Sequence, residues 1–200
     1  MSDQHGAGWA NPMPAGFTAL AIAVMIFYAV LTGKVAREAM PIAGIWLIGG
    51  FFVQVIVGVI ELKLGNSSGG NTFTWFSAYF MLVTGSLWIF QYFAGVYGWK
   101  FDPRITGWAW LTITLILWLE IPMFAKSMPL APFAAIVPMC LALPFITGIY
   151  MGFLDHHTYA PIAGNLAGLC GVLAIYATAA MQTNMVFGRQ VFPFPGPIIK

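Results

Sequence analysis

Six long runs of apolar residues, separated by short polar breaks, constrain this chain more than any other feature of its sequence. The hydrocarbon core of a bilayer is about 30 Å thick, so a helix rising about 1.5 Å per residue needs about 20 apolar residues to cross it. Only 7 % of the residues are charged, which is too few to solvate the surface of a globular protein. The sequence therefore predicts a polytopic membrane protein.

Spans of this length are expected to be helices, because lipid offers no partner to backbone polar groups and barrel strands are only about 10 residues long. We predict an all-α fold with one six-helix transmembrane domain over residues 1–200. The predicted spans are residues 14–31, 42–62, 73–93, 105–125, 130–153 and 159–183. The remaining residues are too few for a soluble catalytic domain, so the function must lie within the membrane.

Composition also excludes several functions. The net charge of +2 comes without a cluster of Lys and Arg, so nucleic acid is not an expected partner. No span contains a His, which argues against a haem-carrying anchor subunit of a redox enzyme. The cysteines, Cys140 and Cys170, lie in apolar runs without the spacing of a metal site. We expect no enzymatic activity, no cofactor and no metal.

Charge does not decide the orientation of the chain. An even number of spans places both termini on one side, and each side carries four basic residues: Lys63, Lys126, Arg189 and Lys200 against Lys34, Arg37, Lys100 and Arg104. We expect the termini to face the cytoplasm from the cell (inner or plasma) membrane.

The last span contains Gly164 and Gly168, a pair of small residues four positions apart. Such pairs allow close backbone approach between membrane helices. The pair suits packing within the chain and contact between subunits equally well.

Four short motifs resemble one family. Residues 11–17 read Asn-Pro-Met-Pro-Ala-Gly-Phe, and residues 54–61 begin with Gln and end with Glu before a Gly-Asn turn. Residues 73–76 read Phe-Thr-Trp-Phe, and short blocks rich in Gly and Ala follow between Ala163 and Arg189. Together they resemble the acetate uptake transporters, the family of bacterial acetate–succinate permeases and fungal acetate and ammonium-export-associated proteins.

The resemblance implies a pore within each protomer and a homo-hexamer. By position, it places a pore constriction at Leu20, Phe76 and Leu141, with Ala174 nearby. Phe76 stands where the family commonly has a Tyr, so any substrate contact of that hydroxyl is lost here.

Candidate substrate contacts come from neutral groups, because no span carries a Lys or Arg. Backbone amides at helix starts favour anions, which draws attention to Asn11, Pro12 and Pro14, and to the segment 71–74. Further hydrogen-bonding side chains are Gln54, Thr74, Ser77 and Tyr79. Hydroxyls on membrane helices also commonly bond their own backbone.

Two carboxylates, Glu61 and Glu120, lie near the ends of predicted spans. They are interfacial residues satisfied by Lys63, Lys126 or a helix end, or they couple proton movement to transport. Glu61 matches the motif of the family and is the candidate for proton coupling. Glu120 is unexpected in its span.

These observations predict a membrane transporter or channel for acetate and related small carboxylates, extending to succinate and linked to protons. The expected partners are the carboxylate, the proton and membrane lipid. The alternative within the same scaffold is an uncoupled channel for a small solute such as acetate or ammonia. An apolar ring with weak binding suits rapid passage in both cases.

Overall fold

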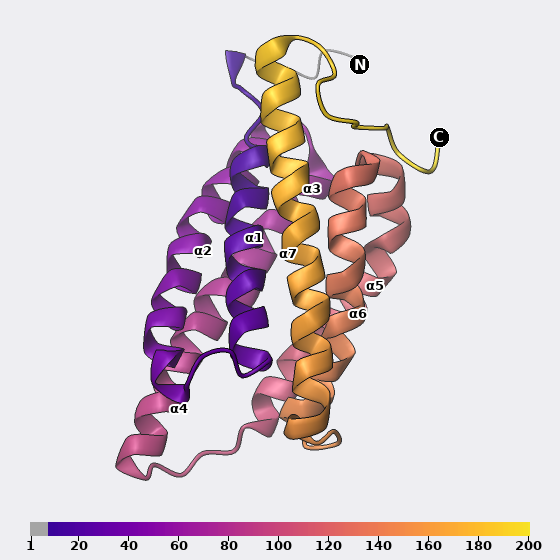
Figure 1. Cartoon of the computed structure of the whole chain (residues 1–200). Coiled ribbons are helices and arrows are strands. Elements are labelled where there is room, and N and C mark those ends of the chain that lie inside the picture. Colours follow the sequence, from indigo (N-terminus) through magenta and orange to yellow (C-terminus); the bar gives the residue numbers. More distant parts are fainter. Residues whose placement is uncertain (1–7) are drawn as a thin grey trace.

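A computed structural model describes residues 8–200, and in this part of the chain all regular structure is helical (Figure 1). The elements are α1 (Met13–Leu31), η2 (Arg37–Ala39), α2 (Met40–Lys63), α3 (Ser67–Phe76), η3 (Ser77–Val83), α4 (Thr84–Tyr97), α5 (Arg104–Ser127), α6 (Leu130–Met151) and α7 (His156–Phe187). Because η2 continues into α2, and α3, η3 and α4 follow one another without a break, six helices are long and apolar enough to cross a membrane. The predicted all-α, six-span fold is confirmed.

The third span is longer than predicted. It covers Ser67–Tyr97 instead of residues 73–93, because the polar stretch after Gly65 starts a helix rather than forming a loop. The Asn66 side chain caps this helix by accepting a hydrogen bond from the Gly69 amide at 3.1 Å. A chain segment that looks like a flexible glycine-rich turn is therefore the first turn of α3.

The third span also changes its winding at η3, which is a π-helix. A π-helix holds more residues per turn than an α-helix, and single turns of this kind often occur at functional sites. Here the π-helix covers seven residues, Ser77–Val83, between α3 and α4. No residue pattern in the sequence marks this segment.

The first and last helices are neighbours in the bundle, and the glycines of α7 face α1. A Cβ added to Gly164 would lie 2.8 Å from Thr32, and one added to Gly168 would lie 2.9 Å from Tyr28. Gly171 continues the same face against Met25. Of the two roles considered for the Gly164–Gly168 pair, the structure shows packing within the chain.

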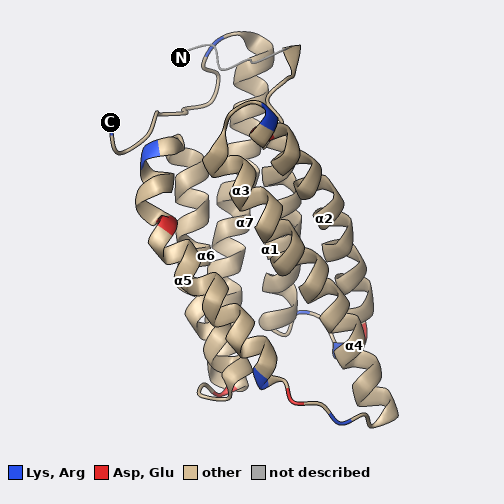
Figure 2. Cartoon of the chain, turned by 180° about the vertical axis from the view of Figure 1, so that it is seen from behind, with Lys and Arg blue, Asp and Glu red and all other residues tan. Residues whose placement is uncertain are grey.

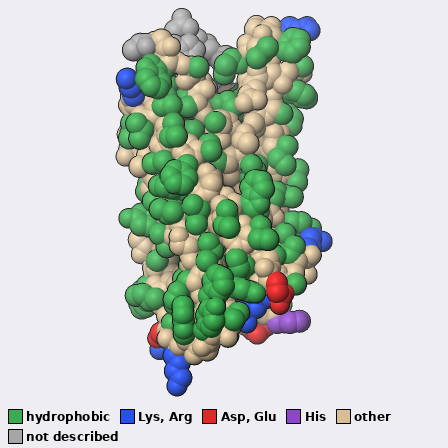
Figure 3. Space-filling view, turned by 90° about the vertical axis from the view of Figure 1, so that its left-hand side faces the viewer, with side chains coloured by type: hydrophobic (Ala, Val, Ile, Leu, Met, Phe, Trp, Pro, Cys, Tyr) green, Lys and Arg blue, Asp and Glu red, His purple; other side chains and the backbone are tan. Residues whose placement is uncertain are grey.

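The outside of the bundle is apolar between two charged ends. Exposed Ile, Leu, Val, Phe and Trp side chains surround the middle, and Lys, Arg, Asp and Glu gather at the ends (Figures 2 and 3). Such a large exposed apolar surface requires a lipid environment. The chain is an integral membrane protein.

Residues 188–200, here called the C-terminal strap, cross the end of the bundle at which α1 begins (Figure 1). The Leu130 amide donates to the Pro195 carbonyl at 3.0 Å, and the Ile199 amide donates to the Ala125 carbonyl at 3.1 Å. The strap is therefore bonded to the last turn of α5 and to the first residue of α6.

Candidate functional site

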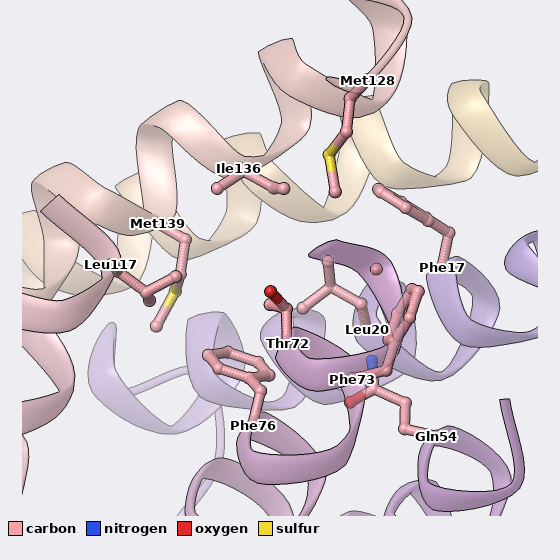
Figure 4. A pocket seen from close by; sticks show the side chains of 11 residues that line it. Phe17, Leu20, Gln54, Thr72, Phe73, Phe76, Leu117, Met128, Ile136 and Met139 are labelled. Atoms are coloured by element: carbon pink, nitrogen blue, oxygen red, sulfur yellow. The ribbon is translucent and has the colours of Figure 1, made fainter. Parts of the chain in front are cut away.

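A small cavity lies inside the bundle near the end where α1 begins. Its volume is about 40 Å³, and residues of α1, α2, α3, α5 and α6 surround it together with Met128 of the α5–α6 turn (Figure 4). We call it the narrow cavity. Its lining residues are Phe17, Leu20, Gln54, Gly69, Thr72, Phe73, Phe76, Leu117, Met128, Ile136 and Met139.

One polar atom in the lining is unpaired. The Gln54 side chain is 1 % exposed, and its Nε2 donates to the Gly16 carbonyl at 3.0 Å. Its Oε1 is buried and accepts no hydrogen bond from residues 8–200. The other polar side chain of the lining, Thr72, already donates its hydroxyl to the Ser68 carbonyl. A buried acceptor without a donor is costly, and Gln54 Oε1 lies behind an accessible lining that is wholly apolar, so a guest molecule reaches it only when the lining shifts.

The glycine of the Asn-Pro-Met-Pro-Ala-Gly motif shapes this site. A Cβ on Gly16 would lie 2.7 Å from the ring of Phe73 and 3.1 Å from Val57. Only glycine leaves room for α1 to approach α2 and α3 this closely. The motif thus brings the Gly16 carbonyl within reach of Gln54 and places Phe73 against the narrow cavity.

Glu61 lies on α2 two turns beyond Gln54 and is 3 % exposed. Its Oε2 accepts a hydrogen bond from Nδ2 of Asn66, the residue that caps α3. Lys63, one of the expected partners, instead lies over the ring of Trp9 at 4.5 Å. A Cβ on Gly69, which lines the narrow cavity, would lie 3.3 Å from Glu61 Oε2. The carboxylate is therefore directly behind the cavity wall.

Glu120 lies elsewhere, on α5. Its Oε2 is buried and has no hydrogen-bond partner among residues 8–200, and it does not line the narrow cavity. The structure thus separates the two carboxylates that the sequence analysis grouped together.

Stacked aromatic rings continue from the narrow cavity toward the other end of the bundle. Phe76 stacks on Phe80 with ring centroids 4.4 Å apart, and Phe80 stacks on Phe27 at 4.8 Å. Trp88 and Trp110 pack against these rings from α4 and α5. We call these five residues the aromatic stack. All five are buried, and they occupy the interior of the bundle between its two ends.

A second hollow, the vestibule, lies beyond the stack at the end opposite the termini. Its volume is about 400 Å³, and its lining includes Phe27, Arg37, Trp88, Gln91, Tyr150 and His156. Phe76 lines the narrow cavity, and Phe27 lines the vestibule. Phe80 stacks on both of these rings, so it lies between the two hollows.

The structure brings together two of the four predicted constriction residues. Leu20 and Phe76 both line the narrow cavity. Leu141 is 53 % exposed on the outside of α6, and Ala174 is buried without lining the cavity. Ile136 and Met139 are the residues of α6 that line the narrow cavity. The sequence could not distinguish the faces of α6, because this helix is apolar all round.

Several predicted substrate contacts are occupied by local hydrogen bonds. Thr74 donates to the Gly70 carbonyl and Ser77 to the Thr74 carbonyl. The Tyr79 side chain is exposed and lines a different hollow, which Thr84 and Trp110 also line. Among the predicted hydrogen-bonding side chains, only Gln54 faces the narrow cavity.

The predicted helix starts also differ from the anion sites that we expected. The Asn11 side chain accepts a hydrogen bond from the Met13 amide at 2.9 Å, and the Pro12 carbonyl accepts from the Ala15 amide at 3.0 Å. Pro12 and Pro14 have no amide hydrogen to offer. Residues 71–74 lie within α3, which begins at Ser67, so their amides are not at a helix start.

Comparisons with known proteins show a shared fold. No protein-family model and no curated protein matches the chain. Among solved structures, the chain is similar to the bacterial acetate channel SatP, with a TM-score of 0.73 and 20 % sequence identity. The similarity covers 93 % of this chain and 99 % of that chain. The six-helix arrangement predicted from the sequence is thus one that a membrane channel also adopts.

Proposed function

We propose that this protein is a channel or transporter for acetate and related small carboxylates. The observation that carries the proposal is the likeness of its fold to an acetate channel over nearly the whole of both chains. The narrow cavity adds support that is independent of this likeness. It lies inside the bundle, where α1, α2, α3, α5 and α6 surround it, and a solute that crosses between these helices would enter it.

The narrow cavity suits a very small solute. About 10 to 15 Å³ of such volume holds one water molecule, so a cavity of about 40 Å³ holds about three groups of that size. The methyl group of acetate fits the apolar lining, whereas a dicarboxylate such as succinate needs the lining to widen. We therefore propose acetate as the better substrate and succinate as a poorer one.

We propose further that the substrate passes the narrow cavity as the neutral acid. A carboxylate anion cannot pair with Gln54 Oε1, because both groups are acceptors, whereas the hydroxyl of a carboxylic acid can donate to it. No Lys or Arg lines the cavity to compensate an anionic charge. Transport is then linked to protons because the proton crosses on the substrate, and Glu61, behind the cavity wall, is a candidate proton donor or acceptor.

The unpaired Gln54 Oε1 also favours a second candidate, an uncoupled channel for ammonia. The N–H groups of ammonia can donate to this oxygen, and ammonia is smaller than the cavity. The remaining features inherited from the family resemblance stay proposals: a homo-hexamer, a pore in each protomer and termini on the cytoplasmic side of the cell membrane.

Uptake into proteoliposomes tests these proposals. Vesicles containing the protein should take up labelled acetate faster than empty vesicles, and an inward proton gradient should drive accumulation. A potassium diffusion potential set with valinomycin should leave the rate unchanged, because a neutral species carries no charge. Rates that follow the potential would refute neutral passage. Uptake no faster than that of empty vesicles at every pH would refute the function, and rapid ammonia flux without acetate flux would favour the second candidate.

A further inference from the structure

We propose that the vestibule binds a carboxylate anion at Arg37, at the end of the bundle opposite the termini. The inference rests on the proposed function, because the anion that it names is the ionised form of the substrate. It adds a second site of different chemistry, which is separated from the narrow cavity by the aromatic stack.

The Arg37 guanidinium is held in place by α4. Its Nη2 donates to the Gln91 carbonyl at 3.4 Å, and the group lies against Gly95, where an added Cβ would overlap Nη2. The surface of α4 therefore has a gap at Gly95 that the guanidinium fills. Arg37 remains exposed, and this one long hydrogen bond together with the Gly95 contact orients its side chain along the wall of the vestibule.

Arg37 is not neutralised by a carboxylate within residues 8–200. Arg104, at the same end of the bundle, gives the contrast, because its Nη2 pairs with Asp102 Oδ2 at 2.7 Å. The nearest acidic residue in sequence is Glu38, which forms no ion pair with Arg37. The charge of Arg37 is therefore available to an anion in the vestibule.

Other polar groups line the same vestibule as Arg37. Tyr150 and Gln91 lie beside one another in its wall, and His156 begins α7 at its rim. Asp155, which precedes His156, uses its Oδ2 to accept a hydrogen bond from the Thr158 amide. Hydroxyl, amide and imidazole N–H groups can all donate to a carboxylate that is held by the guanidinium.

The size of the vestibule fits this role. At about 400 Å³ it holds an anion together with its hydration water, which the narrow cavity at about 40 Å³ cannot. Binding at Arg37 raises the local concentration of the carboxylate next to the stack. Because the guanidinium favours the ionised form, the anion leaves Arg37 before it takes a proton from hydronium in the vestibule water, and the neutral acid then passes the rings.

Chemical protection tests the binding site without requiring transport. Phenylglyoxal modifies arginines, and peptide mass spectrometry of the full chain follows Arg37, Arg104 and Arg189 separately. Sodium acetate should slow the modification of Arg37 several-fold relative to sodium chloride of equal ionic strength. Arg189 lies at the opposite end of the bundle from Arg37, so its modification rate serves as the internal control. Equal rates at Arg37 in both salts would overturn the inference.

A lipid phosphate is the other oxyanion that Arg37 could meet. Protein in vesicles of phosphatidylcholine alone is therefore compared with protein in vesicles that also contain phosphatidylglycerol. Acetate should protect Arg37 in both. Protection that depends on phosphatidylglycerol and not on acetate would assign Arg37 to the lipid and overturn the carboxylate site.

Kinetics complete the test. Arg37→Gln should raise the KM for acetate about threefold to tenfold with little change in maximal rate, as expected for one charge-assisted contact in a wet site. Arg37→Lys should recover part of the loss, and Arg104→Gln, the matched control, should leave KM unchanged. An unchanged KM in Arg37→Gln would overturn the inference. Protection of Arg37 without acetate uptake by the unaltered protein would instead refute the proposed function and leave the binding site standing.

Discussion

Replacing Gln54 with Leu separates the role of this residue in folding from its role in transport. The two side chains have similar volumes, so the substitution removes the amide without opening a large cavity. It deletes the hydrogen bond to the Gly16 carbonyl, which contributes about 0.5 to 1.5 kcal/mol. The Gly16 carbonyl lies within α1 and keeps its helical partner.

The same substitution removes a buried oxygen that has no donor within residues 8–200. Such a group costs about 1 to 3 kcal/mol. The difference predicts that Gln54→Leu stabilises the protein by about 1 kcal/mol, which raises the melting temperature by about 2 to 4 °C in a chain of this size. A polar residue that costs stability and is nevertheless present is expected at a functional site.

A thiol-reactive dye measures the stability. The two cysteines, Cys140 and Cys170, are buried and free, so they react only when the bundle opens. Thr114→Val is the matched control, because Thr114 is also buried but is fully bonded, to the Trp110 carbonyl and to the Thr147 hydroxyl. The melting temperature of Thr114→Val should fall, because this substitution removes hydrogen bonds without removing an unpaired group.

Acetate uptake by Gln54→Leu should drop about tenfold if the acid donates to Oε1, since loss of one buried hydrogen bond of about 1.4 kcal/mol is a factor of ten. A lower melting temperature for this variant would show that Oε1 is satisfied in the folded protein. Unchanged uptake would show that Gln54 does not contact the substrate. Either result would refute the reasoning.

Three further predictions concern other parts of the molecule. Phe80→Ala removes the central ring between Phe76 and Phe27, so acetate flux should rise in proteoliposomes while the free energy of unfolding falls by about 3 to 5 kcal/mol; unchanged flux would show that the stack is not the barrier. Glu61→Gln should reduce the acid stimulation of uptake at matched protein levels, and a pH profile identical to that of the unaltered protein would exclude Glu61 from proton coupling. The Arg104 guanidinium beside Asp102 holds the pKa of that carboxyl at about 2, below its usual 3.8, so its stabilising effect is complete above pH 3.8 and is lost only as the pH falls through about 2. Asp102→Asn should therefore leave the pH profile of uptake between pH 5 and 7 unchanged, and an altered profile would contradict this assignment.

The sequence predicted the membrane helices well because their signal is local. Span length and apolar content follow directly from the thickness of the bilayer, so six spans were found with errors mainly at their ends. The largest error was at residues 67–72, where Ser, Gly and Asn suggest a turn. Asn66 instead caps a helix there, so the helix begins at Ser67.

The interior of the bundle was less predictable, because nearly every face of these helices is apolar. Gln54, the one polar residue in the middle of α2, could be identified as a candidate. Its partner, the Gly16 carbonyl, carries no side-chain signal, and the choice of Ile136 and Met139 over Leu141 depends on the rotation of α6. Arg37 looks like an ordinary charge in a loop until Gly95, far along the chain, is placed beside it.

The pairing of α1 with α7 has a consequence for biosynthesis. The ribosome makes residues 32–155 between these helices, which at about 5 to 20 residues per second takes on the order of ten seconds. During that time α1 sits in the membrane with its future contact surface open to lipid or to an insertion chaperone. Nascent chains that stop before Gly164 cannot cover this surface, so an unfinished copy keeps its first helix unpaired on that side.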